Sequence, residues 1–243
     1  DALVVVGSRF SDRVTGNTAN YAKNATIIQI DIDEAEINKN VSVDMSIIGD
    51  VKAVLERMNE RMEQMYHKEW MDKVMARKDA LPMTYSEEGL TCPYVMEKLD
   101  ELTDSDKTII CTEVGQHQMW CAQFLKFRKP RHWLTSGGLG TMGVGLPYAI
   151  GACVAHPDKP VVCVTGDGSI QMNIQELATA KQLGVAPKII LLNNNYLGMV
   201  RQWQELEYDR RYSHSHMEVT PDFKALAEAY GHVGIAVSYT HLR

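Results

Sequence analysis

Short apolar segments alternate with longer segments of mixed apolar and charged residues along most of the chain. The segments 161–166 and 188–192 are apolar at nearly every position. Such runs are typical of parallel strands that are buried on both faces. The segment 170–183 between them predicts a helix. The pattern therefore predicts a strand–helix–strand unit, which is the building block of an α/β fold with parallel sheets flanked by helices.

The same alternation predicts two α/β units. Strands are expected at 3–6, 26–33, 41–48, 108–113 and 132–134, and helices at 50–77, 93–102, 118–126, 148–155, 199–207 and 222–230. In the long helix that Asp50 caps, apolar residues at helical spacing are expected to form a core stripe: Val51, Val54, Leu55, Met58, Met62 and Met65. We expect a first unit over 1–80, a linker over 81–89, a second unit over 90–236, and a tail outside both over 237–243.

Charge and cysteine content narrow the class of protein. The net charge of −6, without a long basic run, argues against nucleic acid as the partner. No stretch of about 18 apolar residues occurs, so we expect no membrane span and no membrane partner. Five cysteines show no metal-ligand spacing, and their odd number indicates a reducing compartment, so a cytoplasmic protein is expected. Cys153 and Cys163 lie in apolar runs and are expected to be buried thiols.

Two polar residues mark the ends of the two apolar runs. Asp167 follows the first run and Asn194 the second, 27 residues later. In an open α/β sheet, ligands bind at the carboxyl ends of the strands. Carboxylate and amide oxygens at that edge suit a hard cation such as Mg²⁺ holding a phosphate. Gly168 and Ser169 add backbone N–H groups at a helix start, where an anion is stabilised.

A rival motif lies upstream. The segment 138–143 matches G-x-G-x-x-G, follows a short strand, and is itself followed by an acid, Asp167, at the end of the next strand. This arrangement is typical of a nicotinamide dinucleotide site. Pro147 in the first turn of the phosphate-binding helix and the further glycine at 145 count against that interpretation. It also leaves the run of three asparagines at 193–195 without a role.

The Gly-Asp-Gly of 166–168 followed by Asn193 and Asn194 resembles the thiamine diphosphate motif, in which G-D-G precedes N-N by about 25 to 30 residues. Further segments resemble the large catalytic subunit of acetolactate synthase (acetohydroxyacid synthase), and they extend over nearly the whole chain, to about residue 235. They are 7–16, 30–33, 49–51, 114–120, 135–140, 171–177 and 197–203. The resemblance implies a thiamine-diphosphate-binding domain preceded by part of a flavin-binding, Rossmann-like middle domain.

The resemblance also implies roles for single residues. Mg²⁺ would be held by Asp167, Asn194 and the main-chain carbonyl of Tyr196. Thiamine diphosphate would contact residues on four loops: Gln116, His117, Gly140, Thr141, Met142, Asp167, Gly168, Ser169, Asn194, Asn195, Tyr196, Leu197, Gly198 and Met199. Met142 would hold the cofactor in a bent shape, with Met119 and Trp203 beside the substrate channel. FAD would contact the first unit at Gly7, Ser8, Arg9, Phe10, Ser11, Asp31, Ile32, Asp50 and Val51.

The implied reaction is the decarboxylation of pyruvate and transfer of the two-carbon unit to pyruvate or 2-oxobutanoate, for branched-chain amino acid synthesis. The family's partners are a second copy of the chain and a small regulatory subunit. Its activating glutamate belongs to an N-terminal domain expected before Asp1, so no residue here is assigned a catalytic role, and we expect this chain alone to be inactive. Alternatives are a pyruvate oxidase or glyoxylate carboligase, a nicotinamide dehydrogenase, and a non-enzymatic cofactor-binding module. His214 and His216 are expected to be surface histidines.

Overall fold

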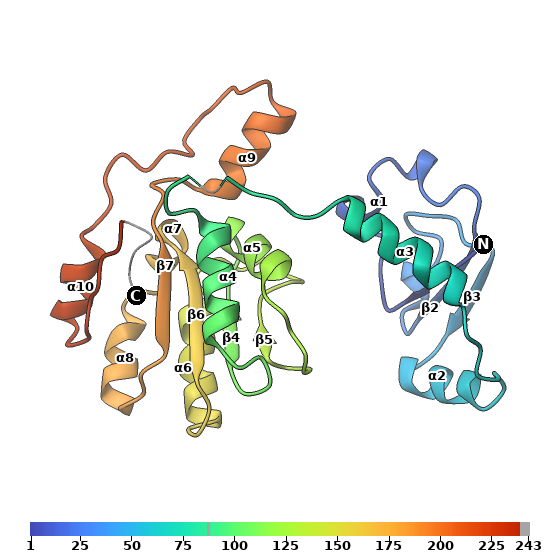
Figure 1. Ribbon diagram of the computed structural model, residues 1–243, viewed down its shortest axis with the longest axis horizontal. Helices are drawn as coiled ribbons and strands as arrows, with labels where there is room; N and C mark the ends of the chain where they lie inside the picture. Colours follow the sequence, from blue (N-terminus) through green and yellow to red (C-terminus); the bar gives the residue numbers. More distant parts are fainter. Residues whose placement is uncertain (87, 239–243) are drawn as a thin grey trace. The chain divides into compact units, whose positions relative to one another are not determined.

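The computed structural model describes residues 1–86 and 88–238. The chain divides into two compact units between Leu81 and Pro82, and each is described by itself (Figure 1). The tail at 237–243 lies mostly outside the described residues, since only Val237 and Ser238 of it are described.

The first unit is built on a small parallel sheet. Its strands β1 (Ala2–Val6), β2 (Thr26–Asp31) and β3 (Met45–Ile48) pair in that order, with Ala2 opposite Thr26 and Ile28 opposite Met45. Short helical turns connect the strands: α1 (Asp12–Thr15), η1 (Thr18–Asn20) and η2 (Glu34–Glu36). A small core cluster of Phe10, Ile27 and Val41 lies against this sheet. All three strands are where the sequence predicts them, and the second and third are shorter than expected.

The helix expected at 50–77 is wrong as a single element. It is two helices, α2 (Val51–Asn59) and α3 (Lys68–Ala80), separated by a non-helical segment. Asp50 does cap α2, because its Oδ1 accepts the N–H of Ala53 at 3.0 Å. The expected core stripe is wrong as well, since α2 has no buried residue and Met62 and Met65 are 55% and 61% exposed. Val51, Val54 and Met58 are half-buried, so the apolar side of α2 is only partly covered, and helical spacing alone does not stabilise a helix of the expected length.

The second unit contains a four-stranded parallel sheet in the order β5-β4-β6-β7. The strands are β4 (Ile109–Thr112), β5 (Trp133–Leu134), β6 (Val161–Gly166) and β7 (Lys188–Leu192). Its helices are α4 (Cys92–Leu102), α5 (Gln116–Phe124), α6 (Gly145–Ala155), α7 (Asp167–Ile170), α8 (Glu176–Leu183), α9 (Gly198–Glu207) and α10 (Phe223–Ala229) (Figure 1).

The central strands of this sheet are buried on both faces. Along β4, Ile110 packs with Met96 of α4 and Cys121 of α5, whereas Ile109 packs with Ala149 of α6. This alternation follows the two-residue period of a strand and places helices on both sides of the sheet. The continuous apolar runs therefore form doubly covered strands, and the expected α/β class with parallel sheets flanked by helices is confirmed.

The single helix expected at 170–183 is interrupted. α7 ends at Ile170 and α8 begins at Glu176. Between them, the Asn173 side chain donates to the carbonyl of Gly143 at 3.0 Å, and backbone bonds of the tighter i to i+3 type run from Ser169 onward. Asparagine competes well for backbone partners and so favours a break over a continued helix. The break joins this segment to the glycine-rich loop before α6.

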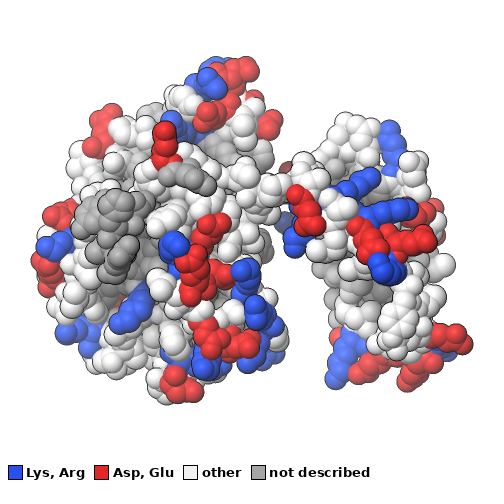
Figure 2. All heavy atoms as spheres, viewed as in Figure 1, with Lys and Arg blue, Asp and Glu red and all other residues white. Residues whose placement is uncertain are grey.

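The surface shows no strong charge segregation in the view drawn. Acidic and basic side chains are interspersed over each unit in Figure 2, and no extended basic patch is seen on that face. Within residues 1–86 and 88–238, no helix is both long enough and apolar enough to cross a membrane. His214 and His216 are both exposed, as expected.

Candidate functional site

Four loops leave the carboxyl ends of the second unit's strands and lie at the same sheet edge. They follow β4 at 113–115, β5 at 135–144, β6 at 166–167 and β7 at 193–197. All four strands are parallel, so their carboxyl ends face one way. This edge is where an open α/β sheet places its ligand, and each thiamine-site residue expected from the sequence lies on one of these loops or in the first turn that follows it.

Asp167 is the most constrained of these residues. It directly follows β6, starts α7, and is 1% exposed. Its Oδ2 accepts the N–H groups of Asn194 at 3.0 Å and Asn195 at 2.6 Å, and its Oδ1 accepts that of Gly168 at 2.9 Å. Burial raises the pKa of the Asp167 carboxyl above its usual value, and these three N–H donors oppose that rise. The carboxylate therefore ties the β6 loop directly to the β7 loop.

The β7 loop is held from both sides. Asn195 adopts a left-handed φ of 59°, and the Asn194 side-chain oxygen accepts the N–H of Tyr196 at 3.0 Å. On the other side, the segment 215–217 pairs with it through bonds from Leu197 N–H to the Ser215 carbonyl and from Met217 N–H to the Asn195 carbonyl. Neither of these two bonds uses the carbonyl of Tyr196, which is the main-chain oxygen expected to bind Mg²⁺.

Glycines allow the loops to approach one another closely. A Cβ on Gly168 would lie 2.7 Å from Leu197, and one on Gly198 would lie 2.2 Å from the Gln116 side chain. Both distances are shorter than van der Waals contact. Gln116 in turn donates to the Gln202 side chain at 3.0 Å, which links the start of α5 to α9. The loops after β4, β6 and β7 thus form one packed group.

The residues expected near the aminopyrimidine ring lie on the loop between β5 and α6. Gly140 has a φ of 69° and Gly143 a φ of 80°, both in the left-handed region that favours glycine. Thr141 donates its N–H to Ser136 Oγ at 2.9 Å, which folds this loop back on itself. Gly140 and Thr141 are exposed and Met142 is half-buried, so this side of the edge is open in the chain described.

The residues expected beside the substrate channel lie on helices that meet at this edge. Met119 is half-buried on α5, and Trp203 is 42% exposed on α9. Near them an open cavity of about 520 Å³ is lined by Gln116, Asn194, Tyr196, Gly198, Arg201, Gln202, Glu205 and Leu206. The Arg201 guanidinium lies over the Tyr196 ring, 4.2 Å from its centroid, and Glu205 also lines the cavity, so its wall carries one charge of each sign.

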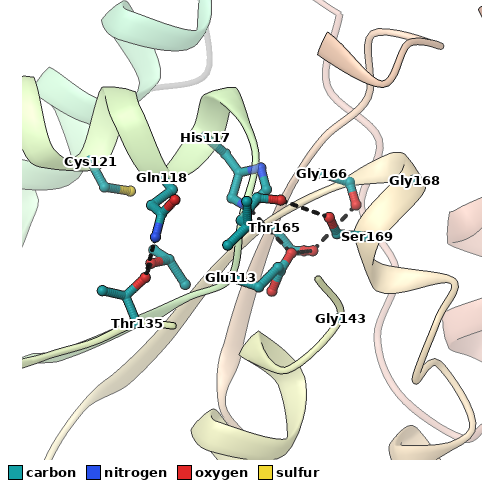
Figure 3. A network of polar contacts seen from close by, with 12 residues as sticks. Glu113, His117, Gln118, Cys121, Thr135, Gly143, Thr165, Gly166, Gly168 and Ser169 are labelled. Carbon is teal, nitrogen blue, oxygen red and sulfur yellow. Dashed lines mark hydrogen bonds and ion pairs between the residues drawn. The ribbon is translucent and has the colours of Figure 1, made fainter. Parts of the chain in front are cut away.

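A buried polar pair lies beneath the site, and it joins His117, which is expected from the sequence, to Glu113, which is not. Glu113 is 1% exposed and His117 is 4% exposed. The Thr165 hydroxyl donates to Glu113 Oε1, and His117 Nε2 lies 3.2 Å from the same oxygen (Figure 3). Ser169 Oγ donates to the Val114 carbonyl at 3.2 Å, which links α7 to the same loop. The four-residue spacing of Glu113 and His117 gave no signal at the sequence level, because only the strand-to-helix turn brings them together.

The expected flavin residues gather at one edge of the first unit's sheet. Residues 7–11 follow β1, Asp31 ends β2, and Asp50 and Val51 follow β3. Gly7 has a φ of 61°, Asp31 is 8% exposed, and Ile32 is 70% exposed. Several of the remaining side chains have local structural roles: Phe10 is buried in the core cluster, and Asp50 caps α2. Ser8, Arg9 and Ser11 complete the loop after β1.

The sheet order disagrees with a nicotinamide site at 138–143. In a dinucleotide-binding unit, the acid ends the strand that neighbours the glycine-rich strand. Here β5 precedes the glycines and β6 ends in Asp167, but β4 lies between them. The glycine loop and Asp167 are therefore not on adjacent strands, as a dinucleotide site would require.

The residues present fit Mg²⁺ and a diphosphate. Asp167 supplies a carboxylate, Asn194 an amide oxygen and Tyr196 a main-chain carbonyl, which are the hard oxygen ligands that Mg²⁺ prefers. A carboxylate has about four acceptor positions, and Asp167 uses three of them in the bonds above. Within residues 1–86 and 88–238, no cluster of three His, Cys, Asp or Glu side chains could hold a metal, so a transition-metal site of that kind is not indicated.

Comparison with known proteins agrees with this geometry. Residues 113–242 match the C-terminal TPP-binding domain of thiamine pyrophosphate enzymes, and residues 1–58 match the central domain of these enzymes. The chain is 48% identical over 251 residues to the acetolactate synthase isozyme 3 large subunit of Escherichia coli (strain K12). That alignment covers 99% of the chain and 43% of the relative.

Two further relatives have the same character. The acetolactate synthase large subunit of Haemophilus influenzae is 46% identical, with 98% of this chain and 43% of the relative covered. The chloroplastic acetolactate synthase of Arabidopsis thaliana is 45% identical, with 95% of this chain and 37% of the relative covered. The chain thus spans well under half the length of the relatives it matches. With the central and C-terminal domain models both matched, the chain belongs to the family of thiamine pyrophosphate enzymes.

Proposed function

We propose that this chain forms the cofactor-binding part of an acetolactate synthase large subunit. The enzyme decarboxylates pyruvate and transfers the two-carbon unit to pyruvate or 2-oxobutanoate, in the synthesis of valine, leucine and isoleucine. The observation that supports this most strongly is the Asp167 carboxylate, which joins the loops after β6 and β7 through N–H bonds from Asn194 and Asn195. The relatives that bear this name in bacteria and in a plant agree with the proposal.

The residues divide into groups with different tasks. Asp167, the Asn194 side chain and the Tyr196 carbonyl would hold Mg²⁺. The diphosphate would be bound by Gln116, His117, Gly168 and Ser169 and by the backbone from Asn195 to Met199, and the aminopyrimidine by Gly140, Thr141 and Met142. When bound, thiamine diphosphate supplies an electron sink for breaking and forming bonds at the carbonyl carbon. Met119 and Trp203 would line the channel through which the 2-oxo acids reach the cofactor.

Binding measurements on this chain test the cofactor assignment. We expect calorimetry to show thiamine diphosphate binding in Mg²⁺ that disappears in EDTA. In Asp167→Ala the affinity should fall about 100-fold or more, which corresponds to about 2.8 kcal/mol. The matched control is Asp158→Ala, because Asp158 is exposed and precedes the amino end of β6, at the opposite edge of the sheet from the site. The assignment would be contradicted if thiamine diphosphate bound equally well without Mg²⁺ and in Asp167→Ala. It would also be contradicted if the chain bound NADH instead of thiamine diphosphate.

The reaction is tested on the full-length enzyme that contains this chain. With pyruvate alone we expect 2-acetolactate, and with 2-oxobutanoate added we expect 2-aceto-2-hydroxybutanoate as well. Consumption of oxygen with production of peroxide would instead indicate an oxidase, and use of glyoxylate in place of pyruvate would indicate a carboligase. Each product is distinguished by mass spectrometry.

We extend the proposal to the flavin and to the partners. The loops after β1, β2 and β3 would hold FAD, with the backbone N–H groups of 8–11 directed to its pyrophosphate, since the Gly7 N–H already donates to the Ile30 carbonyl at 2.9 Å. A second copy of the chain and a small regulatory subunit are the proposed protein partners, and nucleic acid is not. Because all five cysteines are free thiols, we propose a cytoplasmic location. Size-exclusion chromatography with light scattering tests the dimer, and flavin fluorescence quenching tests FAD binding.

A further inference from the structure

We propose that Glu113 is a positioning residue that fixes the ring orientation and the tautomer of His117 beneath the diphosphate site. The inference rests on the proposed function, because His117 matters here as a residue beside the diphosphate. It goes beyond that function by assigning a role to a buried carboxylate that no cofactor contact explains. Glu113 ends the β4 run and His117 lies in the first turn of α5, four residues later.

His117 has little room to move. A Cβ on Gly115 would lie 2.5 Å from its Cε1, and a Cβ on Gly166 would lie 3.2 Å from its Nδ1. The ring therefore lies between the backbones of two loops, at the ends of β4 and β6. Gly166 directly precedes Asp167, so the ring supports the turn that carries the proposed Mg²⁺ ligand. A change in the orientation of the His117 ring would therefore displace that turn.

The Glu113 carboxylate faces the other ring nitrogen. His117 Nε2 lies 3.2 Å from Glu113 Oε1, and it makes no hydrogen bond to any described residue. Oε1 also accepts the Thr165 hydroxyl, which sets the position of the carboxylate (Figure 3). An acceptor so close to Nε2 favours the tautomer with the proton on that nitrogen, because the alternative would place two lone pairs against each other. Nδ1 is then the nitrogen that faces Gly166.

Burying the Glu113 carboxylate costs free energy, which indicates that Glu113 does not serve only to fill space in the core. Glu113 is 1% exposed, and its Oε2 has no hydrogen-bond partner in the described part of the chain. Burying an unpaired carboxylate oxygen is unfavourable, and a core position of this size would be filled more stably by an apolar side chain. Oε2 lies against the start of α6, where a Cβ on Gly145 would be only 1.8 Å away. The fold thus keeps a glycine where the carboxylate needs space.

Four variants of the 243-residue chain separate positioning from packing. Glu113→Gln keeps an acceptor toward Nε2, whereas Glu113→Leu keeps most of the volume and removes the acceptor. Gly145→Ala displaces the carboxylate from the opposite side. Gly151→Ala is the control, because it lies on the same helix and a Cβ there meets nothing within 4 Å. Two-bond proton–nitrogen NMR of the apo chain identifies which nitrogen of His117 carries the proton.

We expect the Nε2-protonated tautomer in the unaltered chain, in Glu113→Gln and in Gly151→Ala. Glu113→Leu and Gly145→Ala should lose that preference and bind thiamine diphosphate with Mg²⁺ about tenfold more weakly, the usual effect of removing a carboxylate that orients a histidine. Glu113→Gln should lose less than about threefold. An unchanged tautomer and affinity in Glu113→Leu would overturn the inference. Failure of the unaltered chain to bind the cofactor would contradict the proposed function, while the NMR result would still decide the role of Glu113.

Discussion

The two units contain parallel sheets with candidate residues at their carboxyl ends, but they hold those residues in different ways. In the second unit the central strands are covered on both faces, and side chains from one loop bond to the next, as Asp167 does with Asn194 and Asn195. In the first unit the sheet is less covered, with Val4 45% and Met45 57% exposed. The Asn40 side chain also joins two loops of the first unit, by donating to the Arg9 carbonyl at 2.9 Å. The two units therefore differ in how well their sheets are covered and in the buried carboxylate that braces the second site.

The largest expected effect compares two methionines. Met96 is fully buried between α4 and the second sheet, whereas Met45 on β3 is 57% exposed. Met96→Ala should lower the free energy of unfolding by about 2–5 kcal/mol, because it leaves a cavity. Met45→Ala should change it by less than about 0.5 kcal/mol. Urea unfolding followed by circular dichroism measures both, and equal losses would show that the first sheet is covered in solution.

A pair of glycines gives the next largest difference. Gly143 and Gly7 both have positive φ values, of 80° and 61°. A Cβ on Gly143 would lie 2.7 Å from Met172 Cβ, whereas one on Gly7 would meet nothing within 4 Å. We expect Gly7→Ala to cost about 1 kcal/mol from the left-handed backbone alone. Gly143→Ala adds a steric clash, so that about 2–4 kcal/mol is expected from the two terms together. Thermal unfolding measures the stability lost in each variant. If Gly143→Ala loses no more stability than Gly7→Ala, the close packing around Gly143 is contradicted.

The next prediction concerns alkaline pH and involves the second unit only, because all five cysteines lie in it. Burial, with a smaller effect of Cys153, raises the pKa of Cys111 to about 12 from an ordinary value of 9.0. The folded state therefore keeps this proton while the unfolded state loses it. Stability is unaffected well below pH 9 and falls as pH rises from about 9 to 12.

At pH 10 this effect amounts to about 1.4 kcal/mol for one such thiol, since one pH unit corresponds to about 1.36 kcal/mol. Cys111→Ala should thus lose less stability than the unaltered chain between pH 8 and pH 10, by that amount. Urea unfolding at the two pH values provides the comparison. Cys153→Ala is the comparison, because burial also raises the pKa of Cys153, but this residue is only half-buried and its effect should be smaller. Parallel losses in all three proteins would argue against a titrating Cys111.

Some elements of the second unit are predicted by local sequence pattern, and others depend on contacts between distant residues. The run before Asp167 is apolar at nearly every position, so its strand and the position of the carboxylate follow from the pattern and from the sheet-edge rule. The break after Ile170 depends on Asn173 reaching the Gly143 carbonyl, 30 residues away, which no local pattern contains. The helix expected at 50–77 is two helices, and the apolar side of the first is only half-buried, which is also a tertiary property that the spacing does not contain.

The burial of Glu113 illustrates the same limit. A glutamate after a strand suggests an exposed side chain, and its neighbours in sequence give no reason to expect otherwise. Its environment comes from Thr165 on β6, His117 on α5 and Gly145 on α6, which are brought together only by the order of the strands. Residue type and spacing predict the candidate ligands, whereas the groups that support them require the assembled sheet.

The smallest expected effect compares two helix caps. Asp50 caps α2 with a bond to the Ala53 N–H at 3.0 Å, and Thr91 caps α4 with a bond to the Tyr94 N–H at 3.4 Å. Replacing either by alanine should cost about 1 kcal/mol. The two losses should appear in different measurements, because α2 has no buried residue while α4 has two in the core.

Helix α2 can open without exposing core side chains, so Asp50→Ala should speed amide exchange within α2 about fivefold, the equivalent of 1 kcal/mol, and leave global unfolding unchanged. Opening α4 exposes Met96 and Leu99, so Thr91→Ala should instead lower the global free energy of unfolding. Hydrogen exchange with mass spectrometry, combined with urea unfolding, separates the two results. If Asp50→Ala lowers global stability as much as Thr91→Ala does, then α2 is tied to the fold more firmly than its exposed side chains indicate, and the contrast between the two units is smaller than their burial implies.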